Sequence, residues 1–255
     1  MFLHKISLYV LPYGQMSLWG ILVLPQTYNL YWIIILILVV NLITEKISTK
    51  IKGEYRIGPH NKDIISIIYG SLLGDAHAEK RTKGVGTRIS FHQEDSHIEY
   101  IYYLHNIMSK AGYCNSKLPI AKKRLGFKGK IRKVCRFHTW TYTSFNQIHN
   151  DWYQEGRKCV PNDIDKYITP LALAIWIMDD GSKIGKSIKF STNSFTYLEC
   201  QNLVIALGKN FELKASIQSA GTDNQYIIYI WKESMKDLRQ IVEPYIIPEM
   251  KYKIN

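Results

Sequence analysis

The chain has 255 residues, of which 46% are hydrophobic, enough for a packed core in one or two domains. Its 33 lysines and arginines outnumber its 21 aspartates and glutamates, and the resulting net charge of +12 favours a polyanionic partner. The four cysteines, at positions 114, 135, 159 and 200, lack the spacing of a zinc site or a disulfide framework, so we expect free thiols in a reducing compartment.

Residues 1–44 form a hydrophobic leader that differs from the rest of the chain. An apolar run over residues 30–43, about fourteen residues long, is short for a bilayer span of about twenty. Tyr31 and Trp32 at its start suit a membrane interface, so a short membrane segment and a peripheral anchor both stay open as interpretations. A cleaved secretory signal is disfavoured because no small-residue cleavage site follows the run.

Residues 45–62 are polar and basic, and their glycines and proline indicate a linker. A long apolar helix is predicted to follow, from Asp63, a suitable N-cap, to the carboxylate of Asp75. Gly70 and Gly74 lie four residues apart on one face of this helix. Another backbone could therefore approach closely there, with Asp75 at the foot of the contact.

A second helix of the same design is predicted near the middle of the chain. It begins after Thr169, a good N-cap, has Pro170 at its first position and ends at Asp180. One such helix alone could equally be a core helix with a solvated acidic end. Two copies favour a duplicated architecture, in which the helices lie side by side and bring Asp75 and Asp180 together.

The segments that follow the two helices also repeat. Each helix is followed by a basic loop, an alternating strand, a helix, further short strands and a last helix. The predicted elements are a strand over 88–92 and helices over 96–110 and 145–153 in the first half, and a strand over 187–191 and helices over 196–209 and 234–245 in the second. We therefore divide the chain into a leader over 1–44, a linker over 45–62, a first repeat over 63–160 and a second repeat over 161–255.

The two helices resemble the paired motifs of LAGLIDADG homing endonucleases, specifically the single-chain, two-motif type encoded in mitochondrial introns. The motifs are IIYGSLLGD over 67–75 and LAIWIMDDG over 173–181, and the resemblance covers roughly residues 56–255. It implies an α+β fold of two pseudo-symmetric αββαββα repeats, with the motif helices at the inter-repeat interface and saddle-like DNA-binding sheets.

The family pattern also implies which residues form the helix interface. Gly70, Gly74 and Ala174 would lie in it. The second helix departs from the pattern, because Ile175 and Asp179 stand where the first helix has Gly70 and Gly74. We therefore expect a less symmetric contact, with more effect on packing than on chemistry.

The resemblance assigns the acids to metal binding. Asp75 and Asp180 take the family's last acidic position and would hold Mg²⁺ between the protein and the scissile phosphates. The backbone carbonyls of Ala76 and Gly181 are further candidate ligands. Asp179 points about 100° around the helix from Asp180, which indicates a supporting or capping role.

The family also places a lysine near the end of each repeat, where it would order the attacking water and stabilise developing charge. The matching positions are Lys158 and Lys253. Because Lys253 lies two residues from the last residue of the sequence, a solvated tail is the alternative for it. Gln93 and His92 are weaker candidates for assisting, and a lone histidine is more often a surface or DNA-contacting residue.

Basic residues interleave with the strands that follow each motif helix, as expected for a sheet that lies along a DNA groove. For any single one of them, a solvated strand face is the competing interpretation. The predicted DNA-binding residues are Lys80, Arg81, Lys83, Arg88, His92, Lys122, Lys123, Arg124, Lys130 and Arg132 in the first half and Lys183, Lys186 and Lys189 in the second.

Upstream of the repeats, residues 10–20 (VLPYGQMSLWG) resemble a stretch of cytochrome b. An exon read into an intron reading frame would produce this, so the resemblance implies a mitochondrial protein encoded in a cytochrome b intron; an unrelated leader is the alternative. The predicted function is a monomeric double-strand DNA endonuclease for intron homing. The alternatives are an RNA maturase that assists splicing of its own group I intron, with or without cleavage, and a membrane-associated structural protein, which explains neither the repeat nor the charge.

Overall fold

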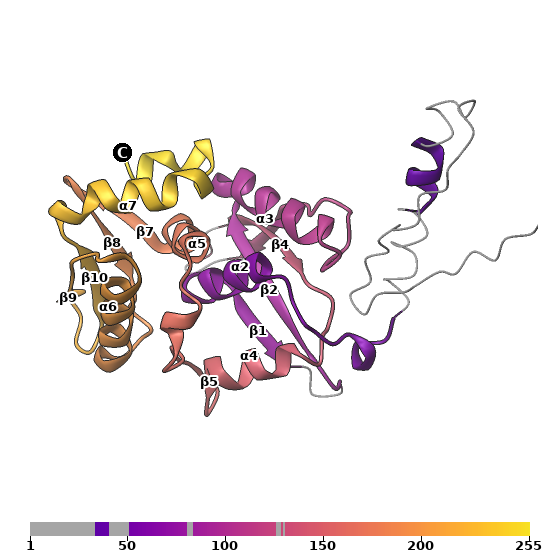
Figure 1. Cartoon of the computed structure of the whole chain (residues 1–255), viewed down its shortest axis with the longest axis horizontal. Coiled ribbons are helices and arrows are strands. Elements are labelled where there is room, and N and C mark those ends of the chain that lie inside the picture. The colour runs from indigo at the N-terminus through magenta and orange to yellow at the C-terminus, as the bar shows by residue number, and fades with distance from the viewer. Residues whose placement is uncertain (1–33, 41–50, 81–83, 126–128, 130) are drawn as a thin grey trace, which may run out of the picture.

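The computed structural model describes residues 34–40, 51–80, 84–125, 129 and 131–255 (Figure 1). From residue 62 onward the described chain forms two similar halves, each with three α-helices and a four-stranded antiparallel sheet. The first half contains α2 (Lys62–Leu73), β1 (His77–Lys80), β2 (Thr87–Glu94), α3 (Ile98–Lys110), β3 (Lys122–Leu125), β4 (Ile131–His138) and α4 (Phe145–Trp152).

The second half repeats this order. It contains α5 (Pro170–Asp180), β7 (Gly181–Ile184), β8 (Ser187–Ser191), α6 (Tyr197–Phe211), β9 (Ala215–Ser219), β10 (Tyr226–Ile230) and α7 (Met235–Val242). Between the halves lies a two-stranded hairpin of β5 (Tyr153–Gln154) and β6 (Arg157–Lys158). The predicted α+β fold of two αββαββα repeats is confirmed.

The two sheets have the same topology, with strand orders β1-β2-β4-β3 and β7-β8-β10-β9. Alternation of side chains along each strand gives every sheet one face in the core and one outward face. On β2 the core face carries Ile89 and Phe91, which are fully or almost fully buried, and on β8 it carries Ile188 and Phe190. On the opposite faces lie half-buried residues such as Arg88 on β2 and Lys189 on β8.

The motif helices α2 and α5 pack against each other between the two sheets (Figure 1). Their close approach depends on Gly70, because a β-carbon there would lie 2.5 Å from the carbonyl oxygen of Ala172. Near the start of the pair, the Thr169 hydroxyl donates to Ser66 Oγ at 2.8 Å. Ala174, predicted to lie in this interface, is completely buried.

The ends of the motif helices differ in detail from the sequence prediction. The N-cap of α2 is Asn61, whose side chain accepts from the backbone N–H of Asp63 at 2.7 Å, so the prediction of Asp63 as N-cap is wrong. Asp63 lies instead in the first turn, where a carboxylate suits the positive end of the helix dipole. Thr169 is the N-cap of α5, with Pro170 at the first helical position, as predicted.

The four cysteines are free thiols, as predicted, and all four are buried. In the segment before α2, residues 34–40 are helical, and a short 3-10 turn, Gly53–Tyr55, follows. His60, inside the range predicted as a linker, contacts the first repeat: its ring nitrogens lie 2.9 Å from the hydroxyl of Tyr113 and 2.7 Å from that of Ser144.

Most of the leader over 1–44, including the stretch that resembles cytochrome b, lies outside the described residues. Within the described part of the chain, no helix has the length and apolar character needed to cross a membrane. Membrane contact through residues 1–44 therefore stays a prediction.

Candidate active site

Three carboxylates gather where the motif helices end. Asp75 is exposed and lies two residues beyond α2, whereas Asp179 and Asp180 are the last two residues of α5. The amide of Gln93, on β2, donates to Asp75 Oδ2 at 2.8 Å and to Asp179 Oδ1 at 3.0 Å. One side chain of the first sheet thus joins the acids of the two repeats.

Burial and the proximity of the other acids raise the pKa of the two aspartates on α5. Burial, together with the negative charge of Asp75, raises the pKa of Asp180 to about 7, while Lys158 and Lys253 oppose the shift. Burial and the charges of Asp75 and Asp180 hold the pKa of Asp179 well above its usual range. Asp179 packs against Gly74, in the place that the α2 backbone leaves open.

A lysine lies at the end of each motif helix. Lys158 Nζ donates to the carbonyl oxygens of Gly74 at 2.9 Å and Ala76 at 2.8 Å. Burial lowers the pKa of Lys158 to about 8, although the charges of the nearby aspartates, Asp180 first among them, act in the opposite direction. Because helix carbonyls at a C-terminus carry partial negative charge, this is a favourable place for an ammonium group.

Lys253 takes the corresponding place on α5. Its Nζ donates to the carbonyl oxygens of Ile177 at 3.2 Å, Met178 at 2.5 Å and Asp179 at 3.2 Å. The side chain is only 5% exposed, so the alternative of a solvated tail is wrong. Burial lowers the pKa of Lys253 as well, against the charges of the three aspartates.

An open hollow of about 500 Å³ connects Asp75 with the outward face of the first sheet. Its lining combines acidic, amide and basic groups, namely Asp75, His92, Gln93, Glu94, Arg124, Leu125, Arg132 and Val134. The acid site therefore opens onto the predicted DNA-binding face and is not an enclosed pocket.

The strand register shows on which face of the first sheet each predicted DNA-binding residue lies. His92 pairs with Arg136 and Arg124 with Arg132, which places these residues on the outward face. The other outward residues from the prediction are Arg88 and Lys122, whose partners are Glu79 and Val134. Ion pairs with Glu79 and Glu94 hold Arg88 and Arg132 in place.

Lys80 and Lys123 lie on the other face of the same sheet. Lys80 pairs with Thr87, which is completely buried, and Lys123 pairs with Lys133. Both lysines are exposed, but alternation points them away from Arg88 and Arg124. Arg81, Lys83 and Lys130 were also predicted to bind DNA and lie outside the described residues.

The outward face of the second sheet is less basic. Lys189 lies on it, opposite Tyr229 and Ser182, whereas Lys183 pairs with the core residue Ile188. Lys186 lies in the turn between β7 and β8 and is exposed. The neighbouring outward positions on these strands carry hydroxyl, amide and apolar side chains, namely Ser182, Ile184, Ser191, Ser216, Gln218 and Ile227.

The position of Gln93 is a feature of the candidate site that sequence analysis raised only weakly. It shares its side of β2 with Thr87, Ile89 and Phe91, all of them buried, and is itself 7% exposed. A glutamine that continues the inward-facing positions of a strand is a polar group directed towards the core side. That signal is present in the sequence, but its partners Asp75 and Asp179 become visible only in the fold.

A duplicated αββαββα fold with an acid and a lysine at the foot of each interface helix defines the class of protein: the two-motif LAGLIDADG type. The model of the LAGLIDADG DNA endonuclease family matches residues 65–238, and the chain belongs to this family.

Similar proteins include two cytochrome b mRNA maturases and a homing endonuclease. The chain is 54% identical over 206 residues to the cytochrome b mRNA maturase bI2 of Saccharomyces cerevisiae, covering 78% of this chain but 49% of that protein, so it spans about half of that relative's length. It is 48% identical over 197 residues to the cytochrome b mRNA maturase bI2 of Debaryomyces hansenii, covering 77% of this chain and 75% of that protein. The structure of the homing endonuclease I-WcaI bound to its DNA recognition sequence is similar, with a TM-score of 0.69, 28% identity and coverage of 76% of this chain and 87% of that chain.

Proposed function

We propose that this chain is a site-specific DNA endonuclease that cuts both strands of a duplex at the insertion site of its intron. The observation that carries the proposal is the pairing of Asp75 and Asp180 at the ends of the motif helices, each with a lysine at the same helix end. Membership of a DNA endonuclease family and similarity to a homing endonuclease bound to DNA support the same activity.

The acids fit a hard divalent cation such as Mg²⁺. Carboxylate oxygens are the donors that such a cation prefers, and a cation would relieve the crowding of negative charge that, with burial, raises the pKa of Asp180. We assign Asp75 and Asp180 as ligands and keep the carbonyls of Ala76 and Gly181 as candidates, although Ala76 already accepts from Lys158. The described residues contain no group of three or more His, Cys, Asp or Glu able to hold a metal, so water and phosphate oxygens would complete the coordination.

When bound, the cation would supply Lewis acidity at the scissile phosphate and an activated water. The other groups of the site act on position and charge. Gln93 holds the Asp75 carboxylate in one orientation through its amide. Lys158 uses two of its three N–H groups on Gly74 and Ala76, which leaves the third to donate to a phosphate oxygen or to the attacking water.

The test is cleavage of duplex DNA that spans the intronless cytochrome b junction after the Gly20 codon, with Mg²⁺ and then with EDTA. We expect double-strand cutting that requires the cation and is lost in Asp75→Asn and in Asp180→Asn. DNA that remains intact while the folded protein binds it would overturn the endonuclease proposal.

A second candidate function is RNA maturase activity on its own group I intron, and two similar proteins with the name cytochrome b mRNA maturase favour it. RNA binding does not require both acids, so splicing assistance should survive Asp75→Asn and Asp180→Asn. Splicing of the intron RNA with and without protein tests this, and the two activities can coexist. For either activity we propose a mitochondrial location and a monomer, because both repeats are on one chain; a light-scattering mass of twice the chain would contradict the monomer.

A further inference from the structure

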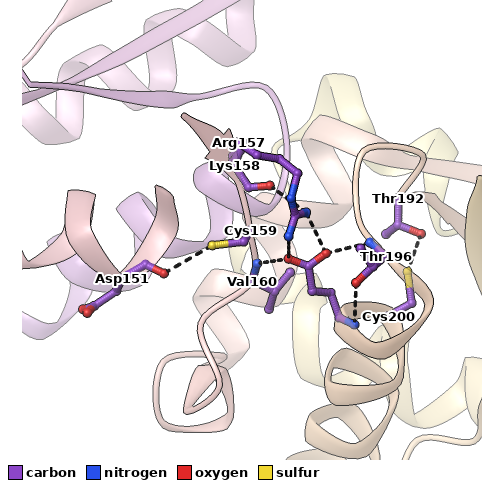
Figure 2. Close-up of polar contacts among 9 residues, drawn as sticks. Asp151, Arg157, Lys158, Cys159, Val160, Thr192, Thr196 and Cys200 are labelled. Atoms are coloured by element: carbon purple, nitrogen blue, oxygen red, sulfur yellow. Dashed lines mark hydrogen bonds and ion pairs between the residues drawn. The ribbon is translucent and has the colours of Figure 1, made fainter. Parts of the chain in front are cut away.

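The β5–β6 hairpin carries Lys158 and lies at the junction of the two repeats (Figure 2). Its two-residue turn has positive φ at Glu155 (50°) and Gly156 (79°), the geometry of a tight hairpin. On the side of the first repeat, the hydroxyl of Tyr153 accepts from the backbone N–H of Ala78 at 3.1 Å. The hairpin strands have only two residues each, so their own ladder gives little rigidity.

On the other side, the hairpin is tied to the second repeat by Glu199, in the first turn of α6. The guanidinium of Arg157 donates to both Glu199 carboxylate oxygens, at 2.9 and 3.0 Å. The same carboxylate accepts from the backbone N–H of Val160 at 3.2 Å and of Thr196 at 2.6 Å, the latter completing a capping box. Figure 2 shows these contacts between residues 157–160 and the start of α6.

The environment of Glu199 indicates a strong, ionised anchor. The residue is 8% exposed, and a bidentate pair between arginine and a carboxylate fixes direction as well as distance. Burial acts to raise the pKa of Glu199, but the hydrogen bonds from Arg157 and Thr196 outweigh it and lower that pKa below its ordinary value.

Arg157 and Lys158 are consecutive in β6, so their side chains leave the strand on opposite sides. Arg157 reaches α6 of the second repeat, and Lys158 reaches the carbonyls of Gly74 and Ala76 at the end of α2 in the first. The placement of the lysine beside Asp75 therefore depends on where Arg157 is held.

We propose that Glu199 is a positioning residue for Lys158: through Arg157 it fixes the hairpin so that the lysine ammonium stays at the end of α2. The consequence for cleavage rests on the proposed endonuclease function. Lys253 holds the other site from the C-terminal 3-10 turn, Pro248–Lys253, and has no contact with this hairpin among the bonds of the described residues. Loss of the contact between Arg157 and Glu199 should therefore impair the site of Lys158 and leave that of Lys253 intact.

The experiment uses the full chain and compares the wild type with three variants: Glu199→Gln, Arg157→Met and a matched control, Asp165→Asn. The control removes the ion pair between Asp165 and Lys209, which joins the 3-10 turn Ile164–Lys166 to the last turn of α6 without touching the hairpin. Arg157→Met leaves the α6 capping box intact, so its effect is separate from any loss of helix stability. Lys158→Met and Lys253→Met identify the DNA strand that each lysine serves.

The first readout is independent of cleavage. The rate of Lys158 acetylation by acetic anhydride, followed by mass spectrometry at one fixed high pH, reports how accessible its amine is. We expect faster acetylation in Glu199→Gln and Arg157→Met, because the side chain is then released from the carbonyls of Gly74 and Ala76, and an unchanged rate in Asp165→Asn. An unchanged rate in both variants would overturn the proposal.

The second readout is strand-resolved cleavage under single-turnover conditions. Glu199→Gln and Arg157→Met should slow one strand by 10-fold or more and accumulate the same nicked product as Lys158→Met, with DNA affinity unchanged. Equal slowing of both strands, as a general loss of stability would give, overturns the proposal. If the wild-type chain cuts no DNA, the endonuclease proposal fails, and the acetylation result alone decides whether Glu199 positions Lys158.

Discussion

The side chain of Asp179 lies where a β-carbon on Gly74 would have to be, across the contact between the two motif helices. The sequence motifs align these two positions with each other, so the smallest residue of one helix accommodates an acid on the other. This pairing keeps α2 and α5 close while it buries a carboxyl group beside Asp75 and Gln93.

Gly74→Ala should therefore destabilise the fold by about 1–3 kcal/mol, because the added methyl group overlaps the Asp179 side chain and the helices must separate. Thermal and urea denaturation measure the change. Gly208→Ala on α6 is the matched control: its β-carbon would have only one neighbour, at 3.9 Å, so this substitution should be neutral or stabilising. Equal stability of the Gly74 variant and the wild type would contradict the close contact between Gly74 and Asp179.

Asp180→Asn should make the protein more stable at pH 8 by about 1–3 kcal/mol, even as it removes cleavage. The folded-state pKa of Asp180, raised to about 7 by burial and Asp75, lies above its unfolded value. The folded chain thus binds more protons than the unfolded chain between about pH 4 and 7, and this aspartate causes stability to fall as pH rises through that window. Urea denaturation from pH 4 to 8 should show a smaller decline in the variant than in the wild type.

Gln93→Leu should slow cleavage about 10- to 100-fold, the usual effect of removing a partner that orients a metal-ligand side chain. DNA affinity should change by less than about 2-fold, since the amide contacts Asp75 and Asp179. Gln147→Leu is the control, because that amide donates to Asp151 on the exposed side of α4. Equal cleavage rates for the two variants would show that Gln93 does not assist cleavage.

Lys122→Ala and Lys123→Ala test the face assignment with two neighbouring, exposed lysines of one strand. Lys122 is on the outward face and should contact phosphate, so its loss should reduce the salt dependence of DNA binding by about 0.9 in the slope of log K against log salt. Lys123 is on the other face and should leave the slope unchanged. Binding isotherms at several salt concentrations measure both, and equal slopes for the two variants would contradict the assignment.

The repeat architecture was accessible from the sequence because it rests on local and periodic signals. Apolar helices with good caps and strands of alternating polarity can be predicted from their own residues, without knowledge of the elements that pack against them. The range of β8, 187–191, was predicted to the residue, and α6 was predicted to within two residues at its end.

The details that sequence analysis missed depend on contacts distant in sequence or on a choice between two similar residues. The sheet face on which Lys80 and Lys123 lie could not be assigned from the sequence. Strands β1 and β3 have four residues each, and only their pairing partners fix which side is outward. The N-cap of α2 was misassigned because Asn61 and Asp63 are both good capping residues. The link from Arg157 to Glu199 joins positions 42 residues apart and has no periodic signature.

The two outward sheet faces differ in chemistry, with arginines on the first and mostly hydroxyl, amide and apolar groups on the second. Each face is encoded by its own stretch of a single chain. A substitution on β9 or β10 therefore changes one face and leaves the other as it was. In a homodimer every such change would occur twice, whereas here the two halves of the surface can adapt to new partners one at a time.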